Sequence, residues 1–119
     1  MSTNKHCFIT TLKPGKLSSY INLHDKIYPE VVTGLRAAGV ISLDIHHINQ
    51  GGGDTLVMYI VTEEGVDLNS AIGPGSKYRK EPKCEQWEDL MDGEFHGGWT
   101  EMGCVHSSQD NWGVMINQT

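Results

Sequence analysis

Two β-branched, apolar segments joined by three consecutive glycines constrain this chain more than any other feature of its sequence. The segments run over residues 40–48 and 55–62, and the connection is Gln50–Asp54. Glycine readily adopts the positive φ angles of tight hairpin turns, so the connection predicts a β-hairpin. Two adjacent antiparallel strands are therefore part of the expected fold.

The remaining patterned segments supply two further strands and two helical regions. Residues 7–12 form a short β-branched run that a Lys-Pro-Gly turn stops, and residues 16–39 then follow helical spacing. Pro82 opens a second helix that extends to Met91, and residues 99–106 read as a last strand. The order βαββαβ predicts an α+β, ferredoxin-like sandwich in which one antiparallel four-stranded sheet carries both helices on one face.

We expect residues 1–119 to form a single domain that ends in a polar tail from Ser107 onward. The segment 63–81 is the least regular, with a short helical stretch at 68–72 and a Gly-Pro-Gly-Ser turn that can act as a lid. A sheet covered on one face needs a partner for the other face. A symmetric homodimer that closes two sheets into an α/β barrel is therefore expected.

His24 is the most informative side chain in the first helical region. Pro29 should kink or break that region near Tyr28, because proline lacks a backbone donor and clashes with the preceding turn. The apolar positions before and after it recur at intervals of three and four, which directs this stripe to the interior. The stripe consists of Leu17, Tyr20, His24, Ile27, Val31 and Leu35. A histidine on such a stripe is more often a hydrogen-bonded core residue than a catalyst, so the spacing alone leaves both interpretations open.

Composition excludes several classes of function. A net charge of −6 and a pI near 5.4 argue against nucleic-acid binding, and the basic cluster within residues 77–83 reads as a solvated loop. No apolar run of about 18 residues or signal pattern indicates membrane insertion or export. Cys7, Cys84 and Cys104 form no CxxC pair, which suits a reducing compartment, so we expect a cytoplasmic protein.

A metal site is not expected. His46, His47, Cys84, His96, Cys104 and His106 lack the spacing of zinc ligands. The segment from His96 to Trp99 is harder to set aside, since its two glycines allow close backbone approach and the segment can line a cavity.

The motif that runs from Tyr20 through His24 to Tyr28-Pro29-Glu30, continued by Leu35-Arg36 and Gly39-Val40, resembles the L-rhamnose mutarotase family. That family has a Tyr, a His four residues on, an aromatic-Pro-Glu and a Gly before the second strand. The segment from Cys84 through Trp87 to Met91 is similar to the family's second helix, which carries a Trp-Trp pair and a Met. Members are small dimeric α/β-barrel proteins that interconvert the anomers of 6-deoxy-hexoses without a cofactor.

The resemblance implies roles for individual side chains. His24 corresponds to the family's proton donor, Tyr20 to a sugar-binding phenol and Trp87 to a sugar-contacting indole. Leu43 stands where the family has a substrate-binding Tyr, and Glu88 stands in place of the second Trp. These two departures make L-fucose, or another deoxy sugar, as consistent with the sequence as L-rhamnose.

Mutarotation needs a proton delivered to the ring oxygen and another removed from the anomeric hydroxyl, and an imidazole can do either near neutral pH. The candidates for a second polar group are Tyr20, Glu88, His46 and His47. We place Tyr20, Leu43, His46, Trp87 and Glu88 in the sugar-binding site. Two alternatives stay open: a cofactor-free monooxygenase or cyclase of the dimeric α/β-barrel group, and a ligand-binding barrel without turnover.

Overall fold

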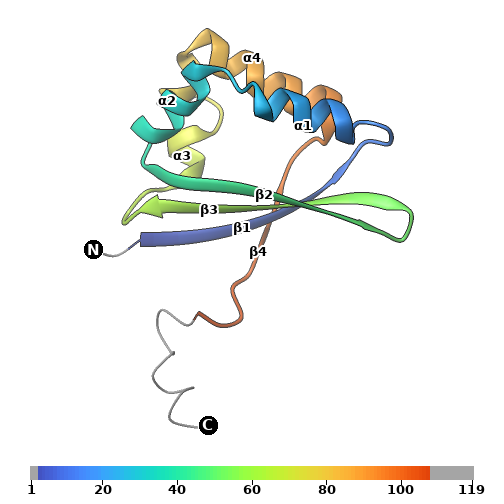
Figure 1. Ribbon diagram of the computed structural model, residues 1–119. Coiled ribbons are helices and arrows are strands. Elements are labelled where there is room, and N and C mark those ends of the chain that lie inside the picture. The colour runs from blue at the N-terminus through green and yellow to red at the C-terminus, as the bar shows by residue number, and fades with distance from the viewer. Residues whose placement is uncertain (1–2, 108–119) are drawn as a thin grey trace, which may run out of the picture.

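The computed structural model describes residues 3–107 as a four-stranded sheet with a layer of helices on one face (Figure 1). The strands are β1 (Thr3–Leu12), β2 (Val40–Gln50), β3 (Gly53–Glu63) and β4 (Thr100–Met102). All pairings are antiparallel, and the strands lie in the order β2-β3-β1-β4. The predicted α+β, ferredoxin-like arrangement is therefore confirmed.

The helices occupy the connections after β1 and β3. They are α1 (Leu17–Asp25), α2 (Pro29–Ala37), α3 (Leu68–Ile72) and α4 (Pro82–Leu90), with a 3₁₀ turn η1 (Tyr78–Lys80) and a π-helical turn η2 (Met91–Phe95). Among the helices within residues 3–107, none is both long and apolar enough to span a membrane.

The predicted hairpin is present, and its turn is shorter than the predicted connection over residues 50–54. β2 ends at Gln50 and β3 begins at Gly53, so only Gly51 and Gly52 form the turn, with φ angles of 67° and 80°. Two positive φ angles are those of a type I′ turn, whose twist matches that of the strands.

A β-bulge near the start of β2 changes which of its side chains face the helices. Val40 pairs with Thr62, whereas Ser42 pairs with Val61, so Ile41 is an extra residue and is 54% exposed. The predicted alternation holds from Leu43 onward, because Leu43 and Ile45 are half-buried opposite Ile60 and Met58 of β3. It does not extend to Ile41.

Pro29 breaks the first helical region completely. α1 ends at Asp25, and α2 begins at Pro29 after an extended Tyr28. Proline fits the first turn of a helix, where its missing N–H has no intrahelical partner to lose. The break places His24 in the last turn of α1, next to the gap between the two helices.

The main core lies between the sheet and the helices. Its buried members come from β1, β3, α1, α2, η1, α4 and η2: Leu12, Leu56, Tyr20, Val31, Tyr78, Cys84, Trp87, Met91 and Phe95. The last strand is shorter than the expected 99–106, and Val105 is fully exposed. Most of the predicted polar tail, including Trp112, lies outside the described residues.

Candidate active site

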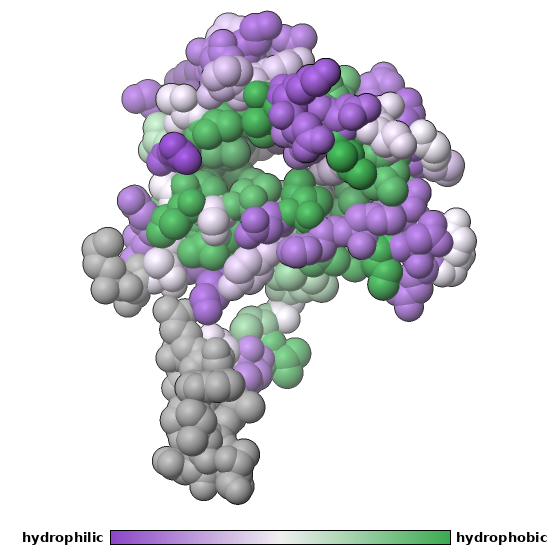
Figure 2. All heavy atoms as spheres, viewed as in Figure 1, coloured by the Kyte–Doolittle hydropathy of each residue, from purple (hydrophilic) through white to green (hydrophobic). Residues whose placement is uncertain are grey.

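A cavity of about 440 Å³ lies between the helix layer and the sheet. Apolar side chains of β1, β2 and β3 form one wall, α1 and α2 form another, and α4 with the segment after η2 closes it. On the molecular surface, hydrophobic residues gather around an opening between the two layers (Figure 2). An apolar cavity with a few convergent polar groups is the usual form of a small-molecule site.

His24 lines this cavity and is held by its own helix. Its Nδ1 lies 2.8 Å from the carbonyl oxygen of Tyr20, and its ring centroid lies 4.2 Å from that of Tyr20 and 5.0 Å from that of Trp87. Because a carbonyl only accepts, Nδ1 carries the proton and Nε2 keeps its lone pair. Burial lowers the pKa of His24, the hydrogen bond to Tyr20 opposes this, and the charge of His96 lowers it further.

Tyr20 lies at the centre of the aromatic contacts. It is 4% exposed, and Phe95 packs against it in a T-shaped arrangement at a centroid distance of 5.5 Å. Burial, and then the charge of Glu88, raise the pKa of its phenol. The hydroxyl therefore stays protonated at neutral pH and can donate a hydrogen bond to a ligand.

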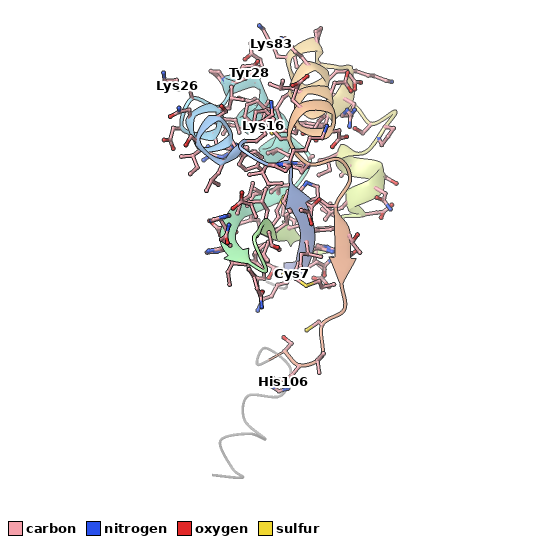
Figure 3. All side chains as sticks on the ribbon, turned by 90° about the vertical axis from the view of Figure 1, so that its right-hand side faces the viewer. Cys7, Lys16, Lys26, Tyr28, Lys83 and His106 are labelled. Atoms are coloured by element: carbon pink, nitrogen blue, oxygen red, sulfur yellow. The ribbon has the colours of Figure 1, made fainter. Side chains whose placement is uncertain are left out.

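Trp87 forms the part of the cavity wall supplied by α4. It is 4% exposed, and its indole meets the rings of His24 and Tyr28 edge-on, the latter at 5.3 Å. Tyr28 lies outside the cavity lining, with the ammonium of Lys83 over its ring at 5.4 Å (Figure 3). Tyr28 thus packs against Trp87 as a core aromatic and does not line the cavity.

Glu88 brings a carboxylate to the apolar cavity. The Tyr78 hydroxyl donates to its Oε2 at 2.8 Å, and within residues 3–107 no group donates to Oε1. Burial raises the pKa of Glu88, while the Tyr78 hydrogen bond and the charge of Arg79 oppose that rise. The carboxylate is thus half-satisfied and has one oxygen available for a ligand.

Arg79 also lines the cavity, which corrects the interpretation of its basic cluster as a solvated loop. Its side chain is 12% exposed, and its guanidinium bonds Glu85 and lies 3.5 Å from Asp89. η1 is only three residues long, so it carries no helical periodicity that the sequence could have revealed. Tyr78, the partner of Glu88, was missed for the same reason.

His96 and Trp99 line the cavity, as the two glycines between them suggested. The His96 ring lies 4.8 Å from the ring of Trp99 and 5.6 Å from that of Tyr20. Its Nδ1 donates to the carbonyl oxygen of Gly97 at 2.7 Å. Burial lowers the pKa of His96, opposed by this hydrogen bond and by Asp92.

The fold brings most of the sequence-predicted site together. Tyr20, His24, Leu43, Trp87 and Glu88 all line the cavity. His46 does not: it is exposed, pairs with Val57 and so lies on the face of β2 turned away from the helices, at the rim of a wider, adjoining groove between β2 and the helices α1 and α2. His47 shares that groove, and its Nε2 lies 2.8 Å from Asp54 at the end of the hairpin.

Comparison with known proteins shows which family this chain resembles. The family model described as L-rhamnose mutarotase matches residues 5–117. An L-fucose mutarotase of Xanthomonas campestris is 30% identical over 98 residues, which cover 76% of this chain and 70% of that protein.

Two shorter matches are L-rhamnose mutarotases. That of Rhizobium meliloti is 48% identical over 42 residues, 35% of this chain and 40% of that protein. That of Rhizobium etli is 39% identical over 46 residues, 39% of this chain and 43% of that protein. These matches thus span less than half the length of either relative.

The fold is also similar to a solved structure. The crystal structure of an L-rhamnose mutarotase from Formosa agariphila superposes with a TM-score of 0.58, covering 87% of this chain and 95% of that one. At 18% identity, this likeness supports the fold alone.

Proposed function

Since the chain belongs to the L-rhamnose mutarotase family, we propose that it interconverts the α and β anomers of a 6-deoxy-hexose of the L-rhamnose or L-fucose type. The observation that carries this proposal is the placement of His24. Its Nδ1 donates to the Tyr20 carbonyl oxygen, and its ring contacts the rings of Tyr20 and Trp87. All three residues line a cavity large enough for a sugar.

The reaction opens the pyranose ring and closes it on the other face of the aldehyde. The C1–O5 bond breaks as O5 gains a proton and the C1 hydroxyl loses one, and closure reverses both transfers after rotation about C1–C2. His24 is the group that exchanges a proton with the sugar, through Nε2. General acid–base help of this kind contributes about 10²- to 10⁴-fold to a rate.

The other cavity residues bind the sugar. Trp87 and Tyr20 offer aromatic faces to the C–H surface of the ring, and the Tyr20 hydroxyl donates to a sugar oxygen. Glu88 accepts from a sugar hydroxyl through Oε1. Leu43 contacts the C6 methyl, a contact worth about 1–3 kcal/mol in discrimination against other sugars. The assignment of His46 to sugar binding stays a prediction, because it lies outside this cavity.

We further propose a cytoplasmic homodimer. The face of the sheet opposite the helices carries the half-buried apolar side chains of Cys7, Ile9, Val57, Tyr59 and Val61, and Cys7 is visible on that face in Figure 3. An apolar sheet face of this kind is typical of a buried interface. Analytical ultracentrifugation tests the dimer, and a Val57→Glu variant should sediment as a monomer.

The activity is tested by NMR saturation transfer between the anomeric protons of equilibrated L-rhamnose and L-fucose. Wild type should accelerate anomer exchange with at least one of the two sugars, and His24→Ala should abolish most of that acceleration. An inactive wild type, or a His24→Ala variant as fast as wild type, would contradict the proposal. His106→Gln is the matched control, because His106 is exposed and does not line the cavity.

A further inference from the structure

A second imidazole faces the same cavity as His24. His96 follows the π-helical turn η2, and its backbone N–H donates to the Met91 carbonyl oxygen at 3.1 Å. The Thr10 hydroxyl of β1 holds the segment that follows, because it donates to the Gly98 carbonyl oxygen at 3.0 Å. Both His24 and His96 pack against Tyr20, at centroid distances of 4.2 and 5.6 Å. One phenol ring thus connects two imidazoles that line one cavity.

The hydrogen bonds of His96 define which of its nitrogens is available. Nδ1 donates to the Gly97 carbonyl oxygen, so Nε2 carries the lone pair. Nothing within residues 3–107 bonds Nε2, and it is not among the fully buried unpaired atoms of those residues, so it is open to the cavity. His24 has the same arrangement, with Nδ1 on a carbonyl and Nε2 open. A group fixed in this way is preorganised for proton transfer.

We propose that His96 is the second proton-transferring group of this site and acts together with His24 on the ring oxygen and the anomeric hydroxyl of the sugar. The proposal rests on the mutarotase function proposed above, and it identifies the group that completes the acid–base pair. It replaces none of the sugar-binding roles of Tyr20, Trp87 and Glu88.

The protons balance when the reaction starts with one histidine protonated and the other neutral. The protonated imidazole gives its proton to O5, the C1–O5 bond breaks with its electrons passing to O5, and the neutral imidazole takes the C1 hydroxyl proton as the aldehyde forms. The proton has then moved from one histidine to the other. On reclosure from the opposite face, O5–H returns a proton to the first imidazole and the aldehyde oxygen takes one from the second, so the enzyme ends as it began.

The alternatives for this second group fit less well. The Oε2 of Glu88 is already bonded to the Tyr78 hydroxyl, and the charge of Arg79 lies nearby. The phenol of Tyr20 gives up its proton far above neutral pH, because burial raises its pKa. His46 pairs with Val57 on the sheet face turned away from the helices, and the Nε2 of His47 lies 2.8 Å from Asp54, so neither imidazole lines this cavity.

The pair predicts a specific dependence on pH. Activity requires one proton on two imidazoles, so it falls when both are protonated and when neither is, which gives a bell-shaped profile. The ionisable groups that line the cavity with His96 come from α1, η1, α4 and η2: Tyr20, His24, Arg79, Glu88 and Asp92. Because burial lowers the pKa of both imidazoles, the maximum should lie below about pH 6.5, the ordinary value for histidine.

The experiment compares His96→Gln and His96→Gly with wild type in anomer exchange of L-rhamnose and L-fucose. His96→Gln should lower kcat about 100-fold or more, with a smaller change in KM, and should lose one limb of the pH profile. After subtraction of the exchange that imidazole catalyses without enzyme, added imidazole should restore activity to His96→Gly, since it replaces the missing base, and should leave the enzymatic rate of His106→Gln unchanged. Circular dichroism melting establishes that each variant is folded.

The outcomes separate the two proposals. A His96→Gln variant with the kcat and pH profile of wild type would overturn the role of His96 while leaving the mutarotase intact. A folded His96→Gly variant that imidazole does not rescue would overturn it as well. If wild type itself does not accelerate exchange with any aldose, the proposed mutarotase function is wrong, and the proposed role of His96 is wrong with it.

Discussion

The Nδ1 of His24 lies 2.8 Å from the backbone carbonyl oxygen of Tyr20, one helical turn earlier in α1. The acceptor belongs to the backbone, so no side-chain replacement at position 20 removes it. The backbone of α1 therefore sets the orientation and tautomer of His24. The phenol of Tyr20 is not needed for this and can bind a ligand.

Replacing Tyr20 by Phe should accordingly weaken catalysis less than replacing His24. If the phenol donates to the sugar as proposed, Tyr20→Phe removes one hydrogen bond worth about 0.5–1.5 kcal/mol and should cost no more than about tenfold in kcat/KM. His24→Gln should cost about 10²-fold or more, because the proton-transferring group is lost. Saturation-transfer rates on the same sugar measure both. A Tyr20→Phe variant as impaired as His24→Gln would show that the phenol itself transfers the proton.

The titration of His24 should couple to stability with a definite sign. Burial lowers its pKa in the folded state below the ordinary 6.5, so the unfolded chain binds more protons in the interval between the two values. The contribution of this group to stability is complete above about pH 6.5 and is lost as the pH falls through the folded-state pKa. His96 acts in the same direction.

Two measurements check this prediction. The imidazole Cε1 proton of His24 should titrate by NMR at a pH below 6.5, the ordinary value for histidine. Urea unfolding should show that His24→Gln loses less stability than wild type between pH 7.5 and 5. A His24 resonance that titrates above 6.5 would contradict the burial argument.

The sequence predicted the parts of the site that lie on periodic segments. Tyr20 and His24 belong to an apolar stripe at helical spacing, and Trp87 lies on a helix that Pro82 opens, so spacing alone placed them toward the interior. The glycine run likewise predicted the position of the hairpin, because the turn depends only on positive φ angles that glycine adopts readily.

Tertiary packing supplied what periodicity could not. Tyr78 and Arg79 lie on a three-residue turn, and only the folded chain shows that one bonds Glu88 and that the other lines the cavity. The sequence also contains no signal for the bulge that exposes Ile41. Apolar and polar residues still alternate through this part of β2, so the extra residue is seen only in the pairing of β2 with β3.

Glu88→Gln should stabilise the protein at neutral pH while weakening sugar binding. Burial raises the pKa of Glu88 in the folded state, so wild type bears the cost of an ionised buried carboxylate once the pH exceeds that pKa. Glutamine keeps an oxygen for the Tyr78 hydroxyl and carries no charge. The melting temperature of Glu88→Gln should exceed that of wild type at pH 8, and the difference should shrink toward pH 4.

The same variant separates binding from chemistry. If Oε1 of Glu88 accepts from a sugar hydroxyl, Glu88→Gln should raise KM and leave kcat within a few-fold of wild type, because the amide is a weaker acceptor than a carboxylate. Exposed Glu94 on η2 provides the control, and Glu94→Gln should leave KM unchanged. A loss of kcat alone in Glu88→Gln would place the carboxylate in proton transfer instead.

Gly34→Ala should destabilise the fold at the contact of α2 with η1 and α4. A methyl group at position 34 would lie 2.8 Å from Cδ1 of Tyr78 and 3.2 Å from Sγ of Cys84. Neither neighbour can yield easily, because Cys84 is fully buried and the Tyr78 hydroxyl is bonded to Glu88 at 2.8 Å. Overpacking costs typically about 1–3 kcal/mol, which exceeds the gain of up to about 1 kcal/mol from replacing a helical glycine with alanine.

Gly93→Ala is the matched control, because a methyl group there meets nothing within 4 Å. Urea unfolding should find Gly34→Ala less stable than wild type and Gly93→Ala equal to it or more stable. Displacement of Tyr78 also loosens its hold on Glu88, so Gly34→Ala should raise the KM for the sugar although position 34 lies outside the cavity lining. Equal stability of the two variants would mean that the Tyr78 ring moves aside without cost, and Glu88 would then not depend on it for its position.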